Sequence, residues 1–141
     1  MKKINLVIHL LSNGTPCACC GETVDVFREY ACNANTHGMA QYGHMDFQIV
    51  LALPDHEIAR ILNTLCLRVQ AGERFKAGDM VSGIYEDCQI RLDEFEETDR
   101  KVLRVIIPDK YNIFPDDDRC METYKLQMLT TKDLELKEET A

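Results

Sequence analysis

The sequence predicts an α+β fold: a single domain in which an antiparallel or mixed β-sheet packs against one main amphipathic helix at about residues 55–71. Three observations predict it. The 141 residues are 45% hydrophobic and 28% charged, which is typical of one domain with a conventional core. Short apolar runs alternate with turn residues, and one stretch has helical spacing. We expect the domain to span residues 1–130, followed by a charged, frayed tail over 131–141.

The first half of the chain predicts two strands. The apolar run over 4–11 ends at the turn residues 12–14 and is typical of a strand. Residues 24–31 fit either a short helix or an alternating strand. The continuous apolar run over 47–53 predicts a strand that is buried on both faces.

The clearest helix follows directly. Pro54 suits a first helical turn, and Asp55 and Glu57 complement the helix dipole there. Gly72 is a natural stop. The apolar stripe expected to face the core consists of Ile58, Ile61, Leu62, Leu65, Cys66 and Val69.

The second half predicts further strands over 80–85, 88–95 and 102–107, separated by charged or Gly-containing turns. A Pro- and Asp-rich loop follows over 112–118. Residues 120–130 fit a last strand or a short helix.

The charge narrows the classes of partner. A net charge of -8 disfavours binding to double-stranded nucleic acid, which needs Lys and Arg to release counterions, and it disfavours anionic membranes. The N-terminal apolar run is interrupted by Asn5 and His9 and lacks a cleavage site, so it does not read as a signal peptide. We expect a cytoplasmic protein.

A polar segment over 36–48 is the strongest candidate for a site, because glycines free its backbone and several polar side chains can then converge. The imidazoles of His37 and His44 can bind a metal, transfer protons or donate to phosphate. Asp46 lies two residues beyond His44, on the same face of an extended chain, and can orient it. The alternative is that both histidines hold a Gly-rich loop through hydrogen bonds to the backbone.

The seven cysteines offer a second candidate. Cys17, Cys20, Cys32 and His37 are four zinc ligands of suitable type, and they predict a zinc ion as cofactor. A single Cys-x-x-Cys pair is a weak zinc pattern. Reduced cysteines in a loop are the alternative reading.

Several segments occur in the order of a known family: Tyr42-Gly43-His44-Met45-Asp46-Phe47, the run over 49–54, Leu62-Asn63, the segment over 71–79, Ile107-Pro108-Asp109 and Phe114-Pro115. Over roughly residues 35–118 the chain resembles the bacterial and phage domain-of-unknown-function family 4262. It departs from that pattern at Met45, where Pro is usual, at Asp46, where Glu is usual, and in having no tryptophan. The resemblance implies a protein of phages or mobile elements that captures a host immune signal.

The functional prediction is a non-catalytic binding protein for a small anionic ligand such as a nucleotide. The ligand can be held across the interface of a homo-oligomer. Tyr42 would stack on the ligand, Asp46 or Gln48 would read its polar edges, and cations from residues 71–79 would meet phosphate. The full set of predicted ligand-binding residues is His37, Tyr42, His44, Asp46, Gln48, Arg74 and Lys76. The alternatives are a small hydrolase that uses its histidines or a metal, and an acidic adaptor that binds a host protein.

Overall fold

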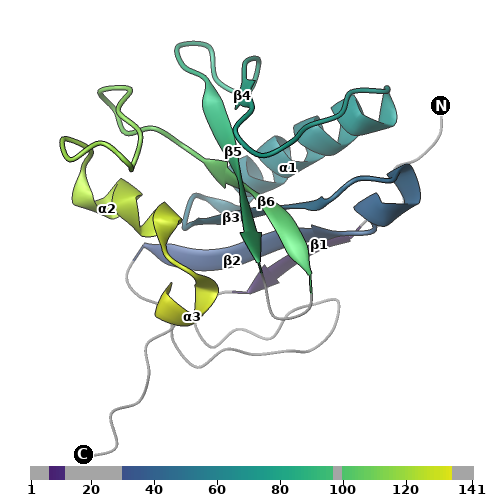
Figure 1. The fold of residues 1–141 in the computed structure, drawn as a ribbon, viewed down its shortest axis with the longest axis horizontal. Helices are drawn as coiled ribbons and strands as arrows, with labels where there is room; N and C mark the ends of the chain where they lie inside the picture. Colours follow the sequence, from purple (N-terminus) through teal and green to yellow (C-terminus); the bar gives the residue numbers. More distant parts are fainter. Residues whose placement is uncertain (1–6, 12–29, 97–99, 135–141) are drawn as a thin grey trace, which may run out of the picture.

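The computed structural model describes residues 7–11, 30–96 and 100–134, and these residues form an α+β domain built on a mixed sheet (Figure 1). The described strands run in the order β1-β2-β3-β6-β5-β4. Strands β3 and β6 are parallel, and every other neighbouring pair is antiparallel. The strands are β1 (Val7–Leu11), β2 (Ala31–His37), β3 (Asp46–Leu51), β4 (Met80–Val81), β5 (Ile90–Glu96) and β6 (Lys101–Ile106).

Helix α1 (Asp55–Gln70) runs behind the strands in Figure 1 and confirms the predicted main helix. The six residues of its predicted apolar stripe are all buried, because their spacing puts them on one side of the helix. The helix ends in a Schellman motif: the Gly72 N–H donates to Val69 O at 3.0 Å, and the Glu73 N–H donates to Arg68 O at 2.9 Å. Gly72 has a φ of 112°, which favours glycine at this position.

Successive residues of the central strands face opposite sides of the sheet. Phe47 points to the α1 side, where its ring lies against Phe75. Gln48 and Arg104 point to the other side, which is covered by a chain of short helices. These are α2 (Glu122–Lys125), the 3-10 helix η2 (Leu126–Met128) and α3 (Thr131–Leu134).

This second face holds a buried polar network that the sequence did not predict. Arg104 is fully buried, and its Nε donates to Gln48 Oε1 at 2.8 Å. One of its terminal nitrogens donates to Gln127 O at 2.9 Å and also to Leu129 O. The guanidinium carbon lies 3.6 Å from the centroid of the Phe95 ring. The network therefore ties η2 to the two central strands.

The structure corrects several sequence predictions. Strand β2 was missed, because Asn33 and Asn35 make it look like a loop; their amides instead lie on the polar face of the sheet. The expected strand over 80–85 is only two residues long. Of the two alternatives for 120–130, the structure has the helical one, over Glu122–Lys125 and Leu126–Met128. The tail predicted to fray from Thr131 begins as α3, with Leu134 fully buried. Residues 24–29 and 135–141 lie outside the described residues.

Among the residues described, no helix combines the length and apolarity needed to cross a membrane.

Candidate functional site

The predicted polar segment over 36–48 contains the connection between β2 and β3, residues 38–45, which we call the Gly-His connection. Gly38 and Gly43 have φ values of 111° and 67°, and they flank the 3-10 helix η1 (Met39–Tyr42). Backbone bonds close this turn, including His44 N–H to Met39 O at 3.2 Å. Glycine is required at both ends because other residues rarely adopt a positive φ.

Asp46 is engaged in holding this connection. Its Oδ1 accepts from the Thr36 hydroxyl at 2.8 Å and from the Met39 N–H at 3.1 Å. Its Oδ2 pairs with the Arg100 guanidinium in a close contact. The Thr36 hydroxyl in turn accepts from the Phe47 N–H at 3.0 Å. The carboxylate thus holds both ends of the turn. This is the structural role that the alternative reading of the sequence assigns to the two histidines.

His44 also bonds to the backbone through both ring nitrogens. Its Nδ1 lies 2.7 Å from Met45 O, and its Nε2 accepts from the Phe75 N–H at 3.0 Å. This pattern requires the neutral tautomer with the proton on Nδ1. The ring packs against Phe47 and Phe75, at centroid distances of 5.2 and 6.1 Å. The observed arrangement matches the alternative reading, in which a histidine holds the loop.

The other predicted ligand-binding residues have varied surroundings. Gln48 is buried in the Arg104 network, and Tyr42 packs partly buried against the core. One guanidinium nitrogen of Arg74 donates to Val69 O and Glu73 O, at 3.1 and 2.8 Å, near the end of α1. The remaining two, His37 and Lys76, are exposed. The structure does bring residues 73–79 against the Gly-His connection, through the bond from Phe75 to His44.

The predicted zinc set is split by strand β2. Cys32 and His37 lie five residues apart on it, which is about 16 Å at about 3.3 Å per residue, so one ion with ligands at about 2.3 Å cannot bind both. Burial, followed by the charge of Asp55, raises the pKa of the Cys32 thiol to about 12. No cluster of three metal-binding side chains occurs within the described ranges. Cys17 and Cys20 lie outside those ranges, and their role stays a prediction.

A different site is formed where β3 and β6 end. Because these strands are parallel, their carboxyl ends meet at one edge of the sheet, the position where open sheets with parallel strands commonly bind ligands. A groove of about 480 Å³ opens there between three connections. This carboxyl-end groove is lined by Leu53, Glu57, Tyr85, Asp87, Cys88, residues 107–112 and Tyr124.

Asp109 shapes one wall of the groove. Its Oδ1 accepts from the N–H groups of Tyr111 and Ile113 at 2.9 and 3.1 Å, and its Oδ2 accepts from Met121 at 2.9 Å. Burial alone would raise the pKa of this carboxyl, but the three backbone donors outweigh burial and hold the pKa below its usual value. The turn also places Asn112 at a φ of 63°, a conformation that asparagine tolerates.

Tyr85 forms part of the opposite wall. Its hydroxyl donates to Glu57 Oε1 at 3.0 Å, and the guanidinium carbon of Arg60 lies 5.3 Å from its ring centroid. Arg60 also approaches Glu57 to 3.6 Å and donates to Ile84 O at 2.9 Å. Burial and the hydrogen bond to Glu57 raise the pKa of the Tyr85 phenol above its ordinary value. The tyrosine is therefore held neutral and fixed in orientation.

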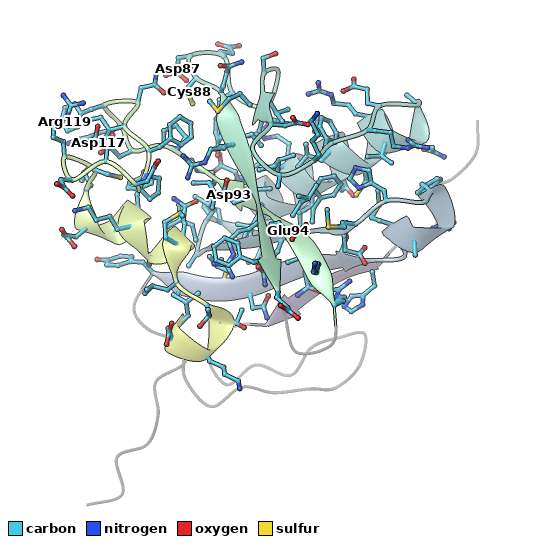
Figure 2. All side chains as sticks on the ribbon, viewed as in Figure 1. Asp87, Cys88, Asp93, Glu94, Asp117 and Arg119 are labelled. Atoms are coloured by element: carbon cyan, nitrogen blue, oxygen red, sulfur yellow. The ribbon has the colours of Figure 1, made fainter. Side chains whose placement is uncertain are left out.

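Figure 2 shows Asp87 and Cys88 side by side on the connection that leads into β5, well away from Asp93 and Glu94 further along that strand. Burial, followed by the charge of Asp87, raises the pKa of the Cys88 thiol, which is half-buried. An adjoining hollow of about 530 Å³ shares four lining residues with the groove: Tyr85, Asp87, Cys88 and Asn112.

This groove was not among the sites predicted from the sequence, although the sequence carries a signal for it. The two apolar strands now seen as β3 and β6 are each followed by Pro-Asp, at Pro54-Asp55 and Pro108-Asp109. If two such strands pair in parallel, their carboxyl ends lie side by side. The two Pro-Asp corners then lie at the same edge of the sheet. The parallel pairing itself was not evident from the spacing.

No family model, curated protein or solved structure matches the chain. The resemblance to family 4262 stays a prediction.

Proposed function

We propose that this protein is a non-catalytic binding protein whose ligand occupies the carboxyl-end groove. The observation that carries the proposal is the lining of the groove, in which the rings of Tyr85, Tyr111 and Tyr124 stand beside carboxylate, amide and lysine side chains. Its volume of about 480 Å³ falls within the range of about 300–1,000 Å³ typical of sites for small ligands. Aromatic walls with a few oriented polar groups favour recognition.

The titratable groups of the groove favour binding over catalysis. The pKa values of Tyr85 and Cys88 are raised, so neither group is activated as a nucleophile or base near neutral pH. The carboxylate of Asp109 is occupied by three backbone N–H groups. Groups held in this way orient a ligand better than they transfer its protons.

A second candidate is nucleotide binding at the Gly-His connection. It is favoured by one contact: the bond from the Phe75 N–H to His44 brings the exposed Lys76 and the neighbouring Arg74 to the same region of the surface. A hydrolase that uses His44 has less support, because both nitrogens of that ring already bond to the backbone. That the protein is of phage type and captures a host immune signal follows from the resemblance alone, whereas the cytoplasmic location is an expectation from the sequence.

The test is a nuclear magnetic resonance titration of the ¹⁵N-labelled full chain with ATP, cyclic AMP, arginine, spermidine and leucine, with the mass of each probe measured after overnight incubation. We expect amide shifts confined to residues 85–88 and 107–112, with the probe unchanged. A probe converted to product would contradict the non-catalytic reading. Shifts confined to residues 38–48 and 73–79 would favour the second candidate instead, and the absence of shifts would remove both.

A further inference from the structure

We propose that the carboxyl-end groove accepts the guanidinium group of an arginine side chain presented by a partner protein. This inference rests on the proposed function and names the ligand class of the same groove.

The charge of the groove favours a cation. Glu57, Asp87 and Asp109 line it, against a single lining lysine, Lys110. Arg60 approaches Glu57 from outside the lining, at 3.6 Å. Asp87 is exposed and lies on the connection into β5 (Figure 2). The whole chain carries a net charge of -8, which attracts a positive partner from a distance.

The chain itself shows the expected recognition geometry at the wall of the groove. Arg60 lies over the face of the Tyr85 ring while it approaches the carboxylate of Glu57, which also accepts the Tyr85 hydroxyl. Tyr111 and Asp87 are exposed residues of the same lining, and they supply an aromatic ring and a carboxylate as well. Lys110 already places its ammonium 5.2 Å from the Tyr111 ring centroid, so that ring is accessible to a cation.

Arginine suits this site better than lysine, because a planar guanidinium can stack on a ring and bond a carboxylate with two N–H groups at once. A partner protein suits it better than free arginine. Tyr111 is 67% exposed at the lip of the groove, and exposed tyrosines often anchor protein interfaces. The adjoining hollow, lined in part by Met80 and Phe114, extends the surface so that it can contact residues on either side of the arginine.

The experiment titrates the full chain with the peptide acetyl-Gly-Gly-Arg-Gly-Gly-amide and with the same peptide carrying citrulline, a neutral isostere of arginine. We expect the arginine peptide to shift the amides of residues 85–88 and 110–112 and to bind about tenfold more tightly than the citrulline peptide. Asp87→Asn and Tyr111→Leu should each weaken binding about fivefold, and Tyr111→Phe should retain it.

The matched control is Asp118→Asn, which removes the same charge from an exposed aspartate outside the groove and should leave the affinity within about twofold. Equal binding of the two peptides, or equal losses in the Asp87 and Asp118 variants, would overturn the inference. If leucine or a nucleotide shifts the groove amides and the arginine peptide does not, the inference fails while the proposed function stands. If no probe shifts them, both fail. If free arginine binds as tightly as the peptide, the inference that a partner protein presents the arginine is wrong.

Discussion

The imidazole of His44 joins two segments that are 31 residues apart in the sequence. It donates from Nδ1 to the next carbonyl and accepts from the Phe75 N–H, and its ring packs against Phe47 and Phe75, whose own rings are also in contact. This side chain therefore helps to hold the segment after α1 against the Gly-His connection.

His44→Ala should lower the free energy of unfolding by about 2–3 kcal/mol, because it leaves the Phe75 N–H without its acceptor and removes a ring that packs against Phe47 and Phe75. His44→Gln should cost less, since an amide oxygen can accept from the same N–H. The measurement is urea unfolding followed by circular dichroism. The exposed His56, changed to Ala, is the control, and it should stay within about 0.5 kcal/mol of the wild type. An Ala variant at position 44 as stable as the wild type would show that the ring is not structural.

The carboxylate of Asp109 should make stability depend on pH in the acid range. Its pKa in the folded state lies below the usual value, so folding favours the ionised form. This contribution is therefore present at neutral pH and is lost as the pH falls through the folded pKa, below about pH 4. Asp109→Asn should lower the thermal unfolding midpoint at pH 7. In this variant the midpoint should also decrease less than in the wild type as the pH falls from about 5 to 2. If the midpoints of the wild type and of the variant decrease equally with pH, Asp109 is not a source of this acid dependence.

At the scale of elements, the side-chain amide of Gln127 is a second link, beside Arg104, that holds η2 against the sheet. Gln127 is fully buried, and its Oε1 accepts from the Ile107 N–H at 2.7 Å while its Nε2 donates to Ile107 O at 2.8 Å. The side chain therefore pairs with Ile107 as a neighbouring strand would, one residue beyond the end of β6. It also donates to Tyr124 O at 3.0 Å, which joins α2 to the same point.

Gln127→Ala should destabilise the protein by about 2–4 kcal/mol, because two buried backbone groups lose their partners. Hydrogen exchange at the Ile107 amide should accelerate more than exchange at amides within α1. Gln89→Ala, at an exposed glutamine, should change stability by no more than about 0.5 kcal/mol. If exchange at Ile107 is unchanged, the proposed pairing does not protect that strand end.

The end of α1 requires a backbone conformation that favours glycine. A Cβ at Gly72 would meet nothing within 4 Å, yet the φ of 112° is one that L-residues rarely adopt. Gly72→Ala should therefore cost about 1–2 kcal/mol without any steric clash. Chemical unfolding measures the loss, and an unchanged far-ultraviolet circular dichroism spectrum would show that the helix itself persists. A neutral or stabilising substitution would mean that the turn relaxes to a negative φ.

For the whole molecule, the sequence predicted the parts of the fold that are governed by apolar periodicity. The stripe of α1 and the buried runs of β3 and β6 stand out because one or both sides of each element face the core. Strand β2 was missed because it carries asparagines whose partners, such as Gln48, come from a strand that pairs with it only in the folded sheet.

The same limit applies to the candidate site. The sequence placed polar residues near two glycines and predicted a ligand, but whether His44 and Asp46 face outward or bond to the backbone depends on Phe75 and Arg100, which are remote in sequence. The groove likewise requires two Pro-Asp corners to meet across a parallel strand pair. The residue types alone do not predict that these two corners lie side by side.

The net charge of -8 leads us to expect opposite salt dependences for stability and binding. Added sodium chloride screens repulsion within the chain, so the thermal midpoint should rise between about 0.02 and 0.3 M. The same salt should weaken the binding of the arginine peptide. Calorimetry at matched ionic strengths measures both quantities. A midpoint that falls with salt would show that attractive pairs such as Arg91 with Asp116, at 2.8 Å, outweigh the general repulsion.

The pairing of β3 with β6 also bears on how the chain reaches its folded state. Gln48 and Arg104, which bond across this seam, are separated by 56 residues, whereas β2–β3 and β5–β6 pair segments much closer in sequence. Contacts between near neighbours form first, because closing a long loop costs more entropy. We expect the two halves of the sheet to form early and to join at the seam in the slowest step. Until then each half presents an unpaired apolar strand edge, and association between chains competes with folding at that stage.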